Sequence, residues 1–401
     1  MARTRARRLR RAGVMTAVLS AAAVSAATLP AHAAPPQGRI HGAGAPGSVT
    51  GGYLVTLAEG TSARSAAGRE LVERYGVRIS HTYGTVLNGY AVRADAGQAG
   101  RLAADPRVAS VVQDTRVTSE HTRRDPPSWG LDRIDQPHRP LDRRYTGPGS
   151  AGSGVTVYVI DTGVRISHED FAGRARHGWD FVRNDRTAQD GNGHGTHVAA
   201  LVAGTSYGVA EKARIVSVRV LDDTGSGTTA QVIAGIDWVT RNARRPAVAN
   251  LSLSGFHNAR LNAAVRASVA SGVTYTVAAG NGGKPAALYS PAGVRQAITV
   301  GATDRQDKKP AFSNHGSALD LFAPGVSVAS ASAASDSGRA TRSGTSAASP
   351  HAAGAAALYL AEHPRATPAQ VEKALVKEAV NGKVTDRGLG SPNRLLQVPR
   401  P

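Results

Sequence analysis

An apolar run followed at once by a polar tripeptide constrains the fold of this chain more than any other feature. Val155 to Ile160 is rich in β-branched residues, and Asp161-Thr-Gly163 follows it directly. Such a run is typical of a strand buried on both faces, as in a parallel sheet covered by helices. In open sheets of this kind, functional groups gather at the carboxyl ends of the strands. The sequence therefore predicts an α/β fold, with Asp161 at the edge of a mostly parallel sheet flanked by helices.

A second segment places His194 at the start of a predicted helix. Glycines at positions 191, 193 and 195 allow a tight turn around this histidine, and the apolar stretch Val198–Val202 continues as a helix. His194 and His197 are spaced i, i+3, and two histidines on one helix can bind zinc. The glutamate of a His-Glu-x-x-His metalloprotease is missing, however, so we expect no zinc here.

A third segment places Ser346 at the N-terminus of another helix. Gly344-Thr345 precedes the serine, and Ala347–Leu360 is a small-residue stretch that suits a helix. Backbone N–H groups at a helix start favour negative charge that develops beside them. We expect Pro350 in the first turn, where the missing N–H would have had no intrahelical partner.

The three side chains form a set that can cut an acyl bond. A serine hydroxyl needs a base to take its proton, and histidine titrates in the right range. The histidine in turn needs a buried carboxylate to fix its tautomer and stabilise the imidazolium. Each segment alone is as compatible with an ordinary structural role as with catalysis. The three in this order point to Asp161, His194 and Ser346 acting together, without a catalytic cofactor.

From about Trp129 to the C-terminus, these segments and their flanking residues resemble the subtilisin-like serine proteases, most closely the proteinase K-like branch. The resemblance implies a serine endopeptidase with broad specificity that favours apolar or aromatic P1 residues. Asp161 would orient His194, His194 would act as general base and then as acid, and Ser346 would be the nucleophile. A triad esterase and a catalytically inactive binding or inhibitor protein are the alternatives.

The same resemblance implies an oxyanion hole and a peptide-binding cleft. Asn281 would donate its side-chain amide to the oxyanion, although an asparagine after glycine is also common in turns. A peptide substrate would add as a β-strand between residues 225–227 and 252–255, with the S1 pocket between 252–255 and 278–280. The residues concerned are Gly225, Ser226, Gly227, Ser252, Leu253, Ser254, Gly255, Ala278, Ala279 and Gly280.

Ser254 departs from the family pattern, which usually has glycine at this position. A side chain on the wall of the S1 pocket is expected to narrow it and to shift the P1 preference towards smaller residues.

The chain has no cysteine, so disulfides do not contribute to its stability. The resemblance implies structural calcium instead, which favours mixed sites of carboxylate and carbonyl oxygens. In one site, Asp320 would be joined by the backbone carbonyls of Arg295 and Ala297. The other resembles a site of the aqualysin-like proteases, although Arg143 and Arg144 stand where small polar ligands are usual. Its residues would be Asp132, Asp135, Gln136 and Asp142. Ordinary loop carboxylates are the alternative at both places.

The first 33 residues predict a secretory signal peptide. Six arginines precede an apolar, Ala-rich stretch, and Ala31-His-Ala33 is a small-x-small cleavage signal. No later apolar run approaches the roughly 20 residues of a membrane span, so we expect a secreted, extracellular protein without a membrane anchor.

A second module, residues 34–117 with a core at about 49–117, is predicted between the signal peptide and the catalytic domain at 118–401. Strand-like segments at 52–57, 87–92 and 108–112 alternate with helix-like segments at 63–75 and 96–104, which suggests a small α+β domain. It resembles the inhibitor-like propeptide of subtilases. That resemblance implies a folding aid and intramolecular inhibitor, cut within residues 115–124. An independent binding domain is the alternative.

The net charge is +19, of which the six arginines of the signal segment account for 6, leaving +13. A basic surface favours polyanions. No aromatic-basic interleaving supports specific nucleic-acid binding, so we expect protein or peptide substrates and a monomer.

Overall fold

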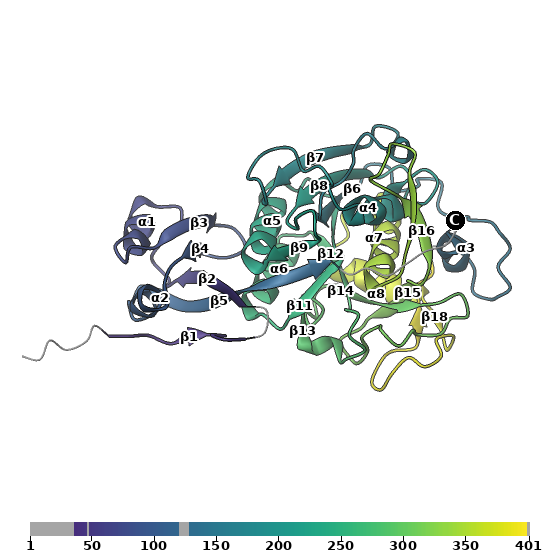
Figure 1. Ribbon diagram of the computed structural model, residues 1–401. Helices are drawn as coiled ribbons and strands as arrows, with labels where there is room; N and C mark the ends of the chain where they lie inside the picture. Colours follow the sequence, from purple (N-terminus) through teal and green to yellow (C-terminus); the bar gives the residue numbers. More distant parts are fainter. Residues whose placement is uncertain (1–35, 46–47, 120–127, 399–401) are drawn as a thin grey trace, which may run out of the picture. The chain divides into compact units, whose positions relative to one another are not determined.

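The computed structural model describes residues 36–45, 48–119 and 128–398 (Figure 1). The predicted signal peptide, residues 1–33, lies outside the described residues, as does residue 120 onward of the predicted processing segment. Within the described part of the chain, no helix is long and apolar enough to cross a membrane.

The N-terminal module is a small antiparallel sheet with two helices, which confirms the predicted α+β fold. Strand β2 lies between β5 and β4, β3 extends the sheet beyond β4, and β1 pairs in parallel with β5. The helices bury their apolar residues against this sheet in a core of their own, which includes Leu71, Leu102 and Val55. The elements are β1 (Ile40–His41), β2 (Ser48–Leu57), α1 (Ala66–Glu73), β3 (Arg78–Tyr83), β4 (Gly89–Arg93), α2 (Ala96–Ala103) and β5 (Val108–Ser119).

The C-terminal part is built on a nine-stranded sheet in the order β18-β19-β15-β14-β12-β10-β6-β8-β7. Every neighbouring pair from β7 to β19 is parallel, and only β18 is antiparallel to its neighbour, as predicted for a mostly parallel sheet. The strands are β6 (Thr156–Asp161), β7 (Ala175–Asp180), β8 (Arg214–Arg219), β10 (Ala247–Leu251), β12 (Thr274–Ala278), β14 (Ile298–Thr303), β15 (Leu321–Pro324), β18 (Val380–Asn381) and β19 (Arg394–Leu395).

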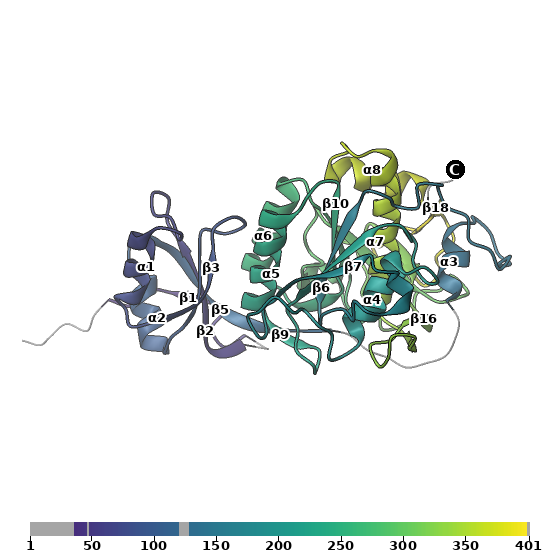
Figure 2. The same ribbon diagram turned by 90° about the horizontal axis from the view of Figure 1, so that it is seen from above.

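Both faces of this sheet are covered by helices (Figure 2). The side chains of β6, which alternate between the two faces of the sheet, explain why both faces need a helical layer. Val157 and Val159 pack into the core formed with α4, α7 and α8, whereas Tyr158 and Ile160 pack into the core formed with α5 and α6. A strand with apolar residues on both sides is stable only between two helical layers. The helices are α3 (Trp129–Ile134), α4 (His194–Ala203), α5 (Thr229–Asn242), α6 (Ala259–Ala270), α7 (Thr345–Glu362) and α8 (Pro368–Glu378), with short 3-10 turns at Glu169–Phe171 and Ala286–Leu288.

Strand β5 continues beyond its own module and lies between two short strands of the C-terminal part. It pairs antiparallel with β9 (Ser226–Thr228) on one edge and with β11 (Leu253–Phe256) on the other. The remaining short strands are β13 (Tyr289–Ser290), β16 (Val328–Ala331) and β17 (Arg339–Arg342).

The prediction that Pro350 falls in the first turn of its helix is wrong. Helix α7 begins at Thr345, so the proline lies a turn further in and removes a hydrogen bond to the carbonyl oxygen of Ser346. The hydroxyl of Ser252 donates to that oxygen instead, over 2.8 Å. The proline thereby leaves an acceptor that ties α7 to the segment before β11.

Candidate active site

The end of β6 and the start of α4 bring Asp161 against His194. Asp161 is the last residue of its strand, and His194 is the first residue of its helix. Nδ1 of His194 lies 2.7 Å from Oδ1 of Asp161, and the two side chains are 1% and 0% exposed. A carboxylate oxygen can only accept, so Nδ1 carries the ring proton and Nε2 is the basic nitrogen.

Ser346 lies at the start of α7, and this helix packs against α4 in one core. The segments before the two helices approach closely, since a Cβ atom on Gly193 would lie 3.2 Å from the guanidinium of Arg342. The structure therefore brings the segment that precedes the serine helix close to the residue before His194.

Thr345 holds the side-chain amide of Asn281. The backbone N–H and the hydroxyl of Thr345 both donate to Oδ1 of Asn281 over 2.9 Å, and the N–H of Gly280 donates to the threonine hydroxyl over 3.0 Å. Because Oδ1 of Asn281 accepts from Thr345, Nδ2 of the same amide points towards the candidate active site. A Cβ atom on Gly344 would lie 2.9 Å from Nδ2 of Asn281 and 2.8 Å from Oγ of Ser346. The two groups thus face one small region.

Two buried residues beside the candidate triad, Thr345 and Asp190, were not predicted as site residues from the sequence. Asp190 is buried, and its carboxylate accepts hydrogen bonds from the backbone N–H groups of Gly193 and Thr196, which lie on either side of His194 in the sequence. A signal existed for each residue. Asp190 precedes a helix start whose N-cap position is a glycine without a capping side chain, and Thr345 directly precedes the serine.

The predicted cleft segments lie on either side of β5. Residues 116–118 of β5 pair with 226–228 of β9, and residues 118 and 119 pair with Ser254 and Leu253 of β11. Gly227 lets β9 approach Val220 closely, since a Cβ atom there would lie 2.4 Å from the carbonyl oxygen of Val220. Gly225 has a φ of 79°, which glycine adopts without strain.

The predicted walls of the S1 pocket also come together. Ser254 is buried, and its hydroxyl lies 3.6 Å from the position of a Cβ atom on Gly280. Ala278 ends β12 and Ala279 follows it, both buried, while Gly255 continues β11. Residues 252–255 and 278–280 are thus neighbours, and the Ser254 side chain lies between them.

The N-terminal acidic residues lie in α3, at its C-cap and in the loop that follows it. Backbone N–H groups of Arg143 and Thr146 donate to Oδ2 of Asp132 and of Asp135, and that of Asp142 donates to Oε1 of Gln136. The other oxygens of Asp132 and Asp135 are buried, with no hydrogen-bond partner among the described residues. Burial raises the pKa of both carboxyl groups, and the nearby charge of Asp142 adds to it. The side chains of Arg143 and Arg144 are exposed.

Asp320 is a second carboxylate with a raised pKa, and it forms no ion pair within the described part of the chain, although the more distant charge of Arg394 lowers its pKa. The N–H of Thr299 donates to its Oδ2 over 2.8 Å, while burial, with the charge of Glu372 adding, raises its pKa to about 7. Arg295 and Ala297 lie in the turn just before β14. In the described part of the chain, no three His, Cys, Asp or Glu side chains gather closely enough to hold a metal by themselves. Either site would therefore need backbone or water oxygens.

Both parts of the chain are similar to known proteins. The Subtilase family model matches residues 152–395, and the Peptidase inhibitor I9 model matches residues 53–120. An extracellular serine proteinase of Thermus sp. (strain Rt41A) is 49% identical, over 81% of this chain and 78% of that protein. An alkaline serine exoprotease A of Vibrio alginolyticus is 46% identical over 80% of this chain, which spans 60% of that protein's length.

A solved structure, described as a cold adapted subtilisin-like serine proteinase, is 50% identical with a TM-score of 0.66. The match covers 68% of this chain and 98% of that one. The Subtilase family model matches more than half of the chain, and the relative from Thermus sp. matches four fifths of it. The chain therefore belongs to the subtilase family of serine endopeptidases and carries an inhibitor-type propeptide domain ahead of its catalytic domain.

Proposed function

We propose that this protein is a secreted endopeptidase that hydrolyses peptide bonds through an Asp161-His194-Ser346 triad and an acyl-enzyme. One observation carries the proposal beyond the family assignment. A segment of the chain itself, residues 116–119, is bound as an extended strand between β9 and β11. Main-chain pairing of this kind suits any peptide in an extended conformation and does not suit a simple ester. Hydrolysis of casein, and its loss after treatment with a serine-reactive phosphonate, tests the proposal.

The geometry supports the following sequence of steps. Nε2 of His194 takes the proton of the Ser346 hydroxyl as Oγ attacks the scissile carbonyl carbon. The oxyanion accepts hydrogen bonds from Nδ2 of Asn281 and from the backbone N–H of Ser346. His194 then protonates the leaving amine, the C–N bond breaks, and an acyl-enzyme remains. A water molecule, deprotonated by His194, attacks the ester and releases the second product.

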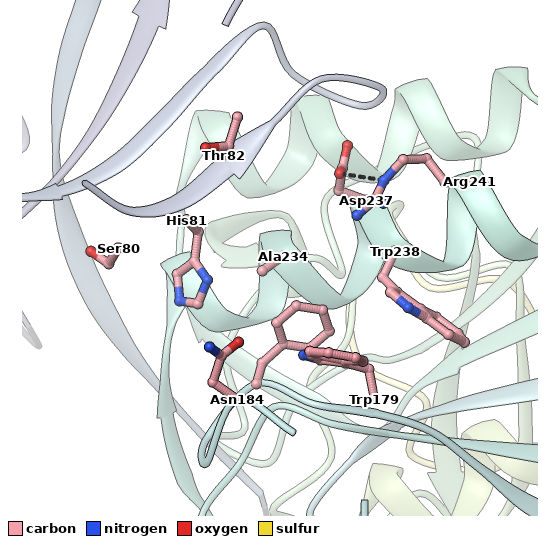
Figure 3. Close-up of a pocket in the computed structure, with 10 residues that line it drawn as sticks. Ser80, His81, Thr82, Trp179, Asn184, Ala234, Asp237, Trp238 and Arg241 are labelled. Atoms are coloured by element: carbon pink, nitrogen blue, oxygen red, sulfur yellow. Dashed lines mark hydrogen bonds and ion pairs between the residues drawn. The ribbon is translucent and has the colours of Figure 1, made fainter. Parts of the chain in front are cut away.

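The propeptide is held by contacts outside the cleft as well. Oδ1 of Asp237 on α5 accepts the backbone N–H groups of Thr85 and Val86, and its Oδ2 accepts from Arg241. Figure 3 shows this ion pair at the edge of a hollow of about 370 Å³ between β3 and α5. The hydroxyl of Tyr83 donates to the carbonyl oxygen of Ala230 at the start of α5. These contacts support an intramolecular inhibitor that stays bound after the chain is cut.

The pairing also supports a position for the cut. The predicted boundary between residues 117 and 118 falls inside β5, so cleavage there would cut a paired strand. The pairing of residues 116–119 with β9 and β11 supports a cut close to the end of this strand. We therefore propose a signal peptide at 1–33, a propeptide from residue 34, and cleavage within residues 115–124. The relative named as an extracellular serine proteinase supports secretion. We also propose a monomer without specific nucleic-acid partners.

Ser254 is proposed to restrict the P1 side chain. Replacing Ser254 by glycine removes a buried hydroxymethyl group from between the S1 walls, so room for large side chains increases. We expect the ratio of kcat/KM for Phe over Ala at P1 to rise about 10-fold in Ser254→Gly. Peptide substrates that differ only at P1, as Phe, Leu or Ala, measure this ratio in both proteins. Identical profiles would show that Ser254 does not line the pocket.

We propose that calcium binds at two places. The buried oxygens of Asp132 and Asp135, which have no hydrogen-bond partner among the described residues, suit a divalent cation. Asp142 and Gln136 would join them, together with backbone or water oxygens. Asp320 would bind the second ion with the carbonyls of Arg295 and Ala297. Bound calcium would supply the positive charge that these carboxylates lack, and it would take no part in the bond cleavage.

Substitution of Asp320 is expected to change the melting temperature in opposite directions with and without calcium. The pKa of Asp320 is raised to about 7, so without metal the free energy of unfolding falls as pH rises from about 4 to about 7. At pH 8 in a chelator, Asp320→Asn should therefore stabilise the fold by on the order of 2 kcal/mol. In the presence of calcium, the melting temperature of Asp320→Asn should rise much less than that of wild type. Melting of the phosphonate-blocked proteins avoids autolysis. An equal calcium-dependent gain in both proteins would exclude a site at Asp320.

A further inference from the structure

The carboxylate of Asp190 organises the turn that presents His194. Its Oδ1 accepts the backbone N–H groups of Asn192 and Gly193 over 3.0 and 2.8 Å, and its Oδ2 accepts the N–H and hydroxyl of Thr196 over 2.9 and 2.6 Å. The side chain is 5% exposed. Gly193 is the N-cap of α4 and has no side chain to accept from the first turn. Asp190 therefore caps the histidine helix from outside it.

Thr162 connects this cap to the strand that ends at Asp161. Its hydroxyl donates to Oδ1 of Asp190 over 2.9 Å and accepts the backbone N–H of Gly195 over 2.9 Å. Thr162 is fully buried. The hydroxyl of Thr162 thus bonds both to Gly195, directly after His194, and to Asp190, which caps α4. The backbone of Thr162 directly follows Asp161.

The carboxylate of Asp161 depends on this connection because it accepts few other hydrogen bonds from the described residues. Oδ1 accepts from Nδ1 of His194 and from the backbone N–H of Thr162, each over 2.7 Å. Oδ2 is buried and has no hydrogen-bond partner among the described residues. Rotation of this carboxylate is therefore resisted mainly by the position of Thr162. A displacement of about 1 Å in such a constellation can cost on the order of 100-fold in rate.

We propose that Asp190, acting through the hydroxyl of Thr162, is a positioning residue that sets the Asp161–His194 geometry. The inference rests on the proposed triad. It assigns to Asp190 no contact with the substrate and no proton transfer. Its effect is on the alignment of the base, so it should appear in kcat and leave KM nearly unchanged.

A matched pair at position 162 tests the proposal. Thr162→Val removes the hydroxyl and keeps the shape, whereas Thr162→Ser keeps the hydroxyl. We expect kcat to fall roughly 10- to 100-fold in Thr162→Val, with KM within about twofold of wild type, and Thr162→Ser to stay within about threefold of wild type in both. The far-downfield proton resonance of His194 Nδ1 should shift in the valine variant and stay in place in the serine variant. A purely structural role would not produce this difference.

Asp190→Asn should resemble Thr162→Val, and the double variant should be no slower than either single variant, since both changes break the same connection. Where a variant fails to mature, the rate of its own propeptide cleavage, followed by intact mass, replaces kcat. Equal kcat in the valine and serine variants would overturn the inference, as would additive losses in the double variant. A wild type that cleaves no peptide would instead overturn the proposed function.

Discussion

Ser346→Ala is expected to abolish both casein hydrolysis and maturation. Without Oγ no acyl-enzyme forms, so the remaining rate comes only from binding and oxyanion stabilisation. The loss should be about a millionfold in kcat, the size that removal of the serine causes in subtilisin, a member of the same family. The chain would also be unable to cut its own propeptide. Intact mass of the protein expressed from residue 34 onwards measures maturation, and casein hydrolysis measures activity.

A control for this variant exists on the same helix. Ser349 is buried in α7, and its hydroxyl donates to Oδ1 of Asn250, which also accepts from the hydroxyl of Thr276. Ser349→Ala should mature and should cleave casein at a rate near that of wild type. Wild type should lose its propeptide by a cut within residues 115–124, while Ser346→Ala keeps its full length. If wild type and Ser346→Ala mature alike in a cell-free preparation without other proteases, the result would contradict self-processing by Ser346.

Asn281→Ala is expected to lower kcat by about 100- to 1000-fold with little change in KM, the loss seen for the oxyanion-hole asparagine of subtilisin. The amide nitrogen interacts with an oxygen whose negative charge develops only in the transition state, so its loss should not weaken substrate binding. Thr345 holds the opposite end of the amide through two hydrogen bonds. Steady-state kinetics on a peptide p-nitroanilide give kcat and KM separately.

Asn281→Asp provides a matched variant for this prediction. The carboxylate has the shape of the amide and can still accept both hydrogen bonds from Thr345, but it presents an oxygen where Asn281 presents a donor. We expect it to be at least as slow as Asn281→Ala, because it removes the donor and repels the oxyanion. A raised KM at unchanged kcat in either variant would place Asn281 in substrate binding and not in oxyanion stabilisation.

The fold could be predicted where the pattern is local and strong. The run before Asp161 is apolar on both sides, and both sides are buried against helices. Strand β3 was missed because its residues alternate between exposed and half-buried positions at the edge of a small sheet, which leaves a polar sequence. Strand β5 was predicted to end at residue 112. It continues to Ser119 because β9 and β11, more than 100 residues further along the chain, supply its partners.

The candidate site, like the fold, could be predicted where the pattern is local and not where it depends on distant partners. Each proposed triad residue follows directly from a strand end or a helix start, so its place could be read from the flanking residues. The role of Thr345 depends on Asn281, and that of Asp190 depends on Thr162, which is 28 positions away. Such contacts follow from the packing of strands and helices and have no counterpart in the spacing of one motif. The same holds for the orphaned oxygens of Asp132 and Asp135.

The residue that carries a covalent phosphonate adduct decides whether Ser346 is the nucleophile. We expect one adduct per mature chain, on the peptide that contains Ser346, formed in step with the loss of casein hydrolysis. Asp161→Asn should slow the reaction strongly, because the imidazole loses the carboxylate that fixes its tautomer. An adduct on another residue, or full hydrolysis by a protein that carries the adduct on Ser346, would contradict the assignment of Ser346 as the nucleophile.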